Sequence, residues 1–474
     1  MQAYPSSGYS FIIRLRYQNL VGMLGSITSC LGSSGVDISS IDIVESGGGF
    51  ITRDITANVR DTAHGHACVE ALRVLPHIRI INVSDRVFLL HLGGKLEITP
   101  RTPMNTQEDL MMAYTPGVSR VSKAILADPD KVFTLTVKRN MVAVVTDGSH
   151  VPGMGNIGAR AAIPRMEGRA VFFKKFAGVD AFPLCLDSGG NIETILTTLR
   201  SIAPVFGAID LEEIDQPQCF EIERQLQKEL DIPVFQGDRH GSAVIVLAAI
   251  INATRLVGKN LGDLKVVLSG TGATATACAR LLLSAGICHL VVGDEHGIID
   301  KTEAASHSDR LWLRDNTNLD RLAGSLAVAL NDADVFVGIS GGPTATPDDV
   351  RTMGRDPIVL GLETYLHIQP EEFAGIARVI ATGRSDYPNQ LTTVLCFPGF
   401  FRGLLDARAP LITETMKRAA AYSIADIVQA HELHEEYILP SVFDKRVATA
   451  LARVVAHEAE HSGLAQRALT SPTG

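Results

Sequence analysis

A short glycine-rich segment carries the clearest chemical signal in this 474-residue sequence. Gly270, Gly272 and Ala275 follow an apolar, β-rich run and precede a helical pattern. In that setting the first glycine permits a tight turn, and the second lets the backbone approach a pyrophosphate at a helix N-terminus. Asp294 follows Ala275 by 19 residues, where a carboxylate can accept hydrogen bonds from a ribose diol. Together with Thr271 inside the turn, these residues predict a dinucleotide site.

The acidic residue also bears on the choice of coenzyme. A carboxylate at Asp294 repels a 2′-phosphate, which favours NAD over NADP. Around it, apolar β-rich runs alternate with helical patterns, which is typical of a parallel, doubly wound α/β sheet. The predicted strands of this sheet are residues 264–269, 288–293, 334–339, 357–362 and 378–381.

The first 95 residues predict a separate, smaller α+β unit. Periodicity places strands at residues 9–16, 36–44, 50–59 and 78–83, and helices at 20–31 and 62–74. The resulting βαββαβ order is that of a ferredoxin-like fold. It resembles ACT domains, which usually pair with a second copy and bind an amino acid or a similar effector. A dimerisation module without an effector fits the pattern equally well.

The composition argues against two classes of partner. The formal charge is −9, so we expect no nucleic-acid surface, which needs clustered basic residues. The longest apolar run, Ala243–Ile251, is nine residues long, whereas about 20 are needed to cross a membrane. The start of the chain shows no secretory signal, and the seven cysteines form no Cys-x-x-Cys pair. We therefore expect a cytoplasmic protein with reduced, buried cysteines.

The remaining predictions rest on a resemblance to a known protein family. Long and specific segments are similar to the bacterial malic enzymes: residues 113–118, 142–148, 155–158, 172–187, 219–223, 231–235, 381–390 and 397–399. With an ACT-like unit ahead of them, the order resembles the ACT-containing NAD-dependent malic enzymes. Those enzymes oxidise malate at C2 with NAD and a divalent metal, then decarboxylate the oxaloacetate to pyruvate.

The resemblance implies an α/β architecture in four parts and a homodimer or homotetramer. The parts are an ACT-like domain at residues 1–95, a malic-enzyme catalytic domain at 96–240, a Rossmann-type NAD-binding domain at 241–439 and a helical tail at 440–474. It also implies roles for single residues. Tyr114 stands at the general acid, and Asn389 falls among the cofactor-binding residues. Glu212, Glu213 and Asp238 stand at the ligands of Mg or Mn, whose hard charge suits oxygen donors.

Several positions depart from the family pattern. Arg169 replaces the family's catalytic lysine, and a guanidinium with a pKa above about 12 cannot act as a base near neutral pH. We therefore expect Arg169 to clamp an acidic group, while His240 or Asp238 takes the hydroxyl proton. Gly237 replaces an aspartate that is another candidate for the proton relay.

The substrate-facing positions change as well. Thr392 and Thr393 replace an asparagine pair, and the family's Ala-Asn-Pro is replaced within residues 361–365. Arg239, together with His150, adds cationic character, which suits a more anionic substrate. We expect an NAD-dependent oxidoreductase acting on malate or a related 2-hydroxy acid. The alternatives are a catalytically silent homologue that binds nucleotide and a partner, and a variant that only dehydrogenates or only decarboxylates.

Overall fold

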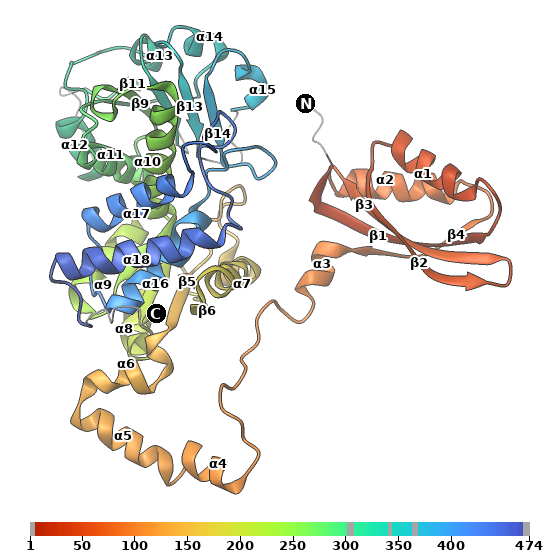
Figure 1. Cartoon of the computed structure of the whole chain (residues 1–474), viewed down its shortest axis with the longest axis horizontal. Coiled ribbons are helices and arrows are strands. Elements are labelled where there is room, and N and C mark those ends of the chain that lie inside the picture. Colours follow the sequence, from red (N-terminus) through yellow and green to blue (C-terminus); the bar gives the residue numbers. More distant parts are fainter. Residues whose placement is uncertain (1–4, 301–307, 340–343, 363–367, 468–474) are drawn as a thin grey trace. The chain divides into compact units, whose positions relative to one another are not determined.

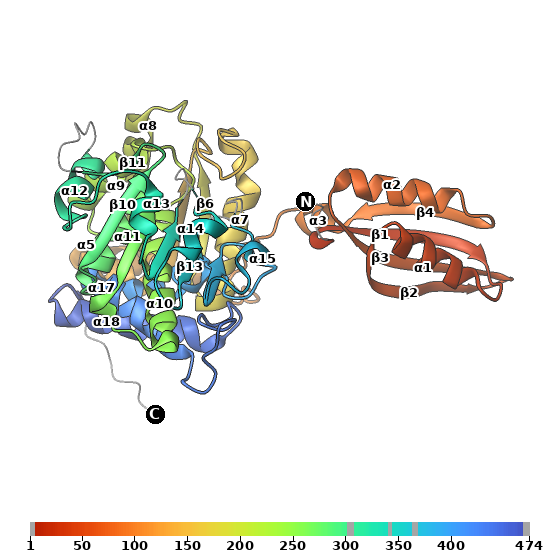
Figure 2. The same cartoon turned by 90° about the horizontal axis from the view of Figure 1, so that it is seen from above.

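The computed structural model describes residues 5–300, 308–339, 344–362 and 368–467. The chain forms two compact units, residues 1–99 and 100–474, which are seen from two directions in Figures 1 and 2. Residues 363–365, part of the substituted segment noted above, lie outside the described residues.

The N-terminal unit is an antiparallel sheet packed against two helices, and its βαββαβ order is the one predicted (Figure 1). Its elements are β1 (Ser6–Gln18), α1 (Met23–Ser33), β2 (Asp37–Gly47), β3 (Phe50–Val59), α2 (Thr62–Arg73), β4 (Ile78–Asp85) and α3 (Arg86–His91). The strands lie in the order β2-β3-β1-β4. Alternate residues of β1, such as Ile13 and Leu15, are buried against Leu31 of α1 and Leu72 of α2.

The first half of the C-terminal unit holds a parallel sheet in the order β6-β5-β7-β8. Its elements are α4 (Gln107–Ala113), α5 (Gly117–Ala127), η1 (Pro129–Lys131), α6 (Val132–Leu135), η2 (Val137–Arg139), β5 (Met141–Thr146), α7 (Gly158–Ala177), β6 (Asp180–Cys185), α8 (Ile192–Ile202), η3 (Ala203–Val205), β7 (Ala208–Leu211), α9 (Gln218–Glu229) and β8 (Val234–Gln236).

The second half holds a sheet in the order β11-β10-β9-β12-β13-β14, parallel except for β11. Its elements are α10 (Gly237–Val257), η4 (Leu261–Asp263), β9 (Lys265–Ser269), α11 (Ala273–Ser284), β10 (His289–Asp294), β11 (Gly297–Ile298), α12 (Ser308–Asn316), α13 (Leu326–Leu330), β12 (Val335–Gly338), α14 (Pro347–Arg351), β13 (Ile358–Gly361), α15 (Pro370–Phe373), β14 (Val379–Thr382), η5 (Thr393–Leu395), α16 (Phe397–Ala407), α17 (Glu414–Ile427) and α18 (Lys445–His461). The five predicted parallel strands are thereby confirmed.

Helix α10 connects the two sheets and forms the centre of the core. It starts directly after β8, and residues 243–254 are buried without a break. Its length and hydropathy would allow it to cross a membrane, but it lies largely buried inside the unit, packed against α11 and α17. The expected domain boundary after residue 240 falls inside this helix.

The C-terminal helix α18 packs closely on α16. A Cβ at Gly403 would lie 2.7 Å from the carbonyl oxygen of Ala452 and 2.7 Å from Cβ of Val455, so only glycine fits this crossing. The segment expected as a helical tail is thus part of the body, where it closes the core beside Phe401.

Candidate active site

The predicted dinucleotide turn connects β9 to α11. Gly270 has a φ of 121°, a conformation that favours glycine, and its N–H donates to the carbonyl of Gly293 at 2.8 Å. Gly272 immediately precedes α11, and Ala275 is fully buried beneath it. Because β9 lies between β10 and β12, the turn sits where the strand order reverses, which is where such sheets bind ligands.

Asp294 ends β10 and is held by an arginine that the sequence did not reveal. Arg310 Nη1 donates to Asp294 Oδ2 at 2.5 Å and to Thr271 Oγ1 at 3.1 Å, and the backbone N–H of His296 donates to Asp294 Oδ1 at 2.9 Å. Burial favours a higher pKa for Asp294, but Arg310 and the His296 N–H outweigh it and hold the pKa below its usual value. The carboxylate that is predicted to bind the ribose is therefore ionised and already has hydrogen-bond partners.

A buried acidic cluster forms at the ends of β7 and β8. Asp210 lies in β7, and Glu212 and Glu213 come directly after the end of this strand. Because β7 and β8 are parallel neighbours, these residues lie beside Gly237 and Asp238 at the start of α10. The side chains of Asp210, Glu212 and Glu213 are at most 6% exposed. Such carboxylates need cationic or hydrogen-bonding partners.

Arg169 of α7 supplies one of those partners. Its Nε donates to Asp210 Oδ2 at 2.9 Å, and its Nη2 lies 2.7 Å from Glu212 Oε1. The guanidinium also stacks on Phe397, 3.5 Å from the ring centroid. Burial opposes the charge, but the surrounding carboxylates raise the pKa of Arg169, so it stays protonated. Burial raises the pKa of Asp210 to about 6, although Arg169 opposes the shift.

Arg165, one helical turn earlier on α7, pairs with Glu213 through Nε and Nη2. Glu213 has a φ of 53°, which is costly for a residue with a side chain. A strained backbone at this position is a feature shared with many functional sites. Oε2 of Glu213 is buried and accepts no hydrogen bond among the described residues.

Gly237 is matched in space to Arg169. A Cβ at position 237 would lie 2.0 Å from Glu212 Oε1 and 2.3 Å from Arg169 Nη2, far inside van der Waals contact. The Glu212 carboxylate and the Arg169 guanidinium therefore occupy the volume that a side chain at position 237 would need. The arrangement of Arg169 and Glu212 thus requires glycine at position 237.

The expected metal ligands fit a hard cation in donor type. Glu212, Glu213 and Asp238 offer carboxylate oxygens, and the unpartnered Oε2 of Glu213 is free to take a cation. The ligand atoms of these three residues do not lie close together, however. Among the described residues, the group whose ligand atoms all lie within 4.8 Å of one another is Asp294, Glu295 and His296. The acidic pair is instead engaged by arginines.

His240 lies in a network of its own on the first turn of α10. Its Nε2 is 2.9 Å from Glu223 Oε1, and its Nδ1 is 3.3 Å from Nζ of Lys417. Burial and the nearby Lys417 lower the pKa of His240 despite Glu223, so the ring is neutral near pH 7. Both ring nitrogens of His240 already have partners, Glu223 and Lys417. Of the two expected proton acceptors, His240 and Asp238, this leaves Asp238.

Other expected residues are turned toward the protein itself. Arg239 lies 3.4 Å from Glu223 and over the ring of Phe220. Thr392 Oγ1 accepts from Val394 N, and Thr393 packs on Gly241 of α10. Asn389 donates to the carbonyls of Ile380 and Glu435 and accepts from the N–H of Ile438. His150 is exposed, and its backbone N–H donates to the Glu213 carbonyl.

Tyr114 is not brought to the acidic cluster within one chain. Its side chain is 68% exposed, and it lies between α4 and α5, neither of which buries a side chain. Leu110 and Met112, close to it along the chain, are exposed as well.

The residues that the sequence did not reveal are Asp210, Arg165, Glu223, Lys417 and Arg310. A carboxylate inside the short apolar strand Ala208–Leu211 was the available signal for Asp210, because a buried charge requires a partner. The other four sit on helices where a charge is ordinarily solvated, so their positions gave no comparable signal.

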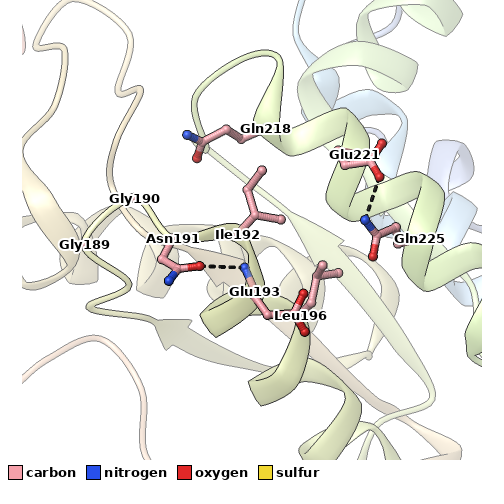
Figure 3. A pocket seen from close by; sticks show the side chains of 9 residues that line it. All are labelled: Gly189, Gly190, Asn191, Ile192, Glu193, Leu196, Gln218, Glu221 and Gln225. Atoms are coloured by element: carbon pink, nitrogen blue, oxygen red, sulfur yellow. Dashed lines mark hydrogen bonds between the residues drawn. The ribbon is translucent and has the colours of Figure 1, made fainter.

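A separate surface hollow of about 590 Å³ lies between the starts of α8 and α9 (Figure 3). Its polar groups bond to one another: Asn191 Oδ1 accepts from Glu193 N, and Gln225 Nε2 donates to Glu221 Oε1. None of the expected site residues lines it. Two glutamates at its wall make it a poor host for a dicarboxylate.

Comparisons with known proteins agree with this geometry. Family profiles described as "Malic enzyme, N-terminal domain" and "Malic enzyme, NAD binding domain" match residues 93–227 and 374–460. An NAD-dependent malic enzyme of Geobacillus stearothermophilus is 47% identical over 456 residues, covering 96% of this chain and 95% of the relative. A bifunctional malic/malolactic enzyme of Bacillus subtilis is 45% identical, covering 81% of this chain and 95% of the relative.

The fold of the C-terminal unit is also similar to solved structures of malic enzymes. The crystal structure of malic enzyme from Pyrococcus horikoshii superposes with a TM-score of 0.75 at 42% identity, covering 80% of this chain and 89% of that one. The NAD-dependent malic enzyme from Thermotoga maritima gives a TM-score of 0.74 at 38% identity, covering 79% and 99%. This chain belongs to the malic enzyme family.

Proposed function

We propose that this chain oxidises malate, or a related 2-hydroxy dicarboxylate, at C2 with NAD, and then decarboxylates the product in the cytoplasm. The observation that carries this proposal is 47% identity to an NAD-dependent malic enzyme over 96% of the chain. The glycine turn before α11 and the ionised Asp294 at the end of β10 support NAD as the coenzyme. The silent homologue and the single half-reaction have less support.

The residues take the following roles in this proposal. Asp238 accepts the proton of the 2-hydroxyl as hydride leaves for the nicotinamide. Arg165, which is 44% exposed, is placed to pair with a substrate carboxylate. Arg169 holds Asp210 and Glu212 in place and does not act as a base.

A divalent cation bound by Glu212, Glu213 and Asp238 would polarise the keto oxygen and stabilise the enolate left by loss of CO2. Tyr114 is the proposed acid that protonates the enolate carbon. Because α4 and α5 bury no side chain in the single chain, we propose that these helices pack on a second copy in a homo-oligomer. Tyr114 would then reach a site that the second copy completes.

The N-terminal unit is proposed as an ACT-like module. Its βαββαβ order and the antiparallel sheet β2-β3-β1-β4 support this assignment. Apolar side chains remain exposed on its outer strands, among them Ile43 of β2 and Ile81 of β4. Such surfaces suit pairing with a second module or an amino-acid effector. A thermal-shift screen with amino acids tests the effector, since a bound ligand raises the melting temperature.

The activity is tested on the purified full-length protein with NAD, Mn²⁺ and a panel of 2-hydroxy diacids that includes L-malate. NADH formation is followed by absorbance, and pyruvate and released CO2 are measured in the same reactions. NADH, pyruvate and CO2 in equal amounts are the expected result. No NADH with any diacid would contradict the proposal, and a keto acid without CO2 would reduce it to a plain dehydrogenase.

A further inference from the structure

The predicted metal site is faced by two arginines that sit one helical turn apart on α7. Arg169 Nη2 lies 2.7 Å from Glu212 Oε1, and Arg165 bonds to Glu213 Oε1 through Nε and Nη2. Each of the two adjacent acidic residues therefore has its own guanidinium. The two arginines together carry the same positive charge as one Mg²⁺ or Mn²⁺ ion.

The two arginines differ in how firmly they are held. Arg169 is 9% exposed, bonded to Asp210, stacked on Phe397 and packed against Gly237, so it is held firmly in place. Arg165 is 44% exposed, and its side chain can leave Glu213 for water. Such a movement would free Oε1 of Glu213, beside Oε2, which is buried and has no hydrogen-bond partner among the described residues.

We propose that Arg165 and Arg169 are resident counter-cations of Glu213 and Glu212, with which a divalent metal ion must compete for the predicted ligand set. The inference rests on the proposed function, because it concerns the metal site of that reaction. A cation approaching the acidic pair meets carboxylates whose charge is already balanced and two like charges beside them. The chain should accordingly bind Mn²⁺ more weakly than the same chain with uncharged side chains at these positions.

The test measures Mn²⁺ binding directly, without turnover. Electron paramagnetic resonance reports the free Mn²⁺ during titration of full-length wild type, Arg165→Met and Arg169→Met, since methionine keeps most of the side-chain length. The matched control is Arg200→Met on α8, whose guanidinium pairs with Glu193 and Glu229 away from the cluster. Circular dichroism checks that each variant is folded.

Removal of one positive charge beside the ligands should tighten Mn²⁺ binding by about tenfold or more, and the control should bind as wild type does. Affinity that is unchanged or weaker in folded Arg165→Met overturns the inference. If Arg169→Met does not fold because Asp210 loses its partner, Arg165→Met decides the question alone, as its side chain is partly exposed.

The Mn²⁺ titration tests the inference and the activity assay tests the proposed function, so either can be contradicted without the other. Tighter Mn²⁺ binding by Arg165→Met supports the inference even if no diacid is turned over. Malate turnover by a wild type whose Mn²⁺ affinity equals that of the variants overturns the inference and leaves the proposed function standing.

Discussion

A methyl group added at Gly237 should destabilise the C-terminal unit. A Cβ there would lie 2.0 Å from Oε1 of Glu212 and 2.3 Å from Nη2 of Arg169. Both atoms end long side chains, but these are buried and ion-paired to each other, so neither moves away without loss. Overpacking of a core generally costs about 1–3 kcal/mol, and we expect Gly237→Ala to lower the free energy of unfolding by about 2 kcal/mol.

The assay is urea unfolding, followed by the fluorescence of Trp312, the single tryptophan of the chain, and by circular dichroism. The control is Gly262→Ala, because a Cβ there would meet only the carbonyl oxygen of Gly286, at 3.6 Å. That control should leave the stability unchanged or raise it by up to about 1 kcal/mol.

A double-mutant cycle measures the part of the clash that Arg169 contributes, the rest coming from Glu212 Oε1. In an Arg169→Lys background the Nη2 atom is absent, so Gly237→Ala should cost about 1 kcal/mol less than in wild type. An equal cost in both backgrounds, or a Gly237→Ala protein as stable as wild type, would refute the reasoning. The paired change Arg169→Lys with Gly237→Asp should raise malate-dependent NADH formation, whereas Gly237→Asp alone should lower it.

Three further predictions concern other parts of the C-terminal unit. Arg310→Leu frees Asp294 to bond the ribose, so the ratio of kcat/KM for NAD over that for NADP should rise about tenfold; an unchanged ratio would contradict this role. Burial lowers the pKa of Lys138 in the folded protein, whereas the unfolded chain keeps the ordinary lysine pKa of about 10.4. Between these two pKa values the unfolded chain binds more protons than the folded protein, so the free energy of unfolding rises with pH. Urea midpoints at stepwise pH should show this rise in wild type and lose it in Lys138→Met. Gly403→Ala should lower the free energy of unfolding by about 1–3 kcal/mol, since its Cβ would lie 2.7 Å from the carbonyl of Ala452; calorimetry showing no loss would count against this packing.

The elements that the sequence predicted well are those whose signal is local. Period-2 alternation marked β1, and short apolar runs bounded by turns marked β9, β10, β12, β13 and β14. The dinucleotide turn was equally visible, because the left-handed φ of Gly270 and the tight fit of Ala275 depend on neighbours in the chain. The roles of Tyr114, Glu212, Glu213 and Asp238 came from resemblance and stay predictions.

By itself, the sequence determined that position 169 carries a permanent cation, which we expected to clamp an acidic group. Only the tertiary structure decided that the partners are the protein's own Asp210 and Glu212, and that Gly237 leaves the room for this arrangement. The physical reason is distance along the chain: Arg169 and Asp210 are 41 residues apart, and parallel strands bring their elements together. Burial then makes the pairing obligatory, because a charge removed from water must be balanced where the fold places it.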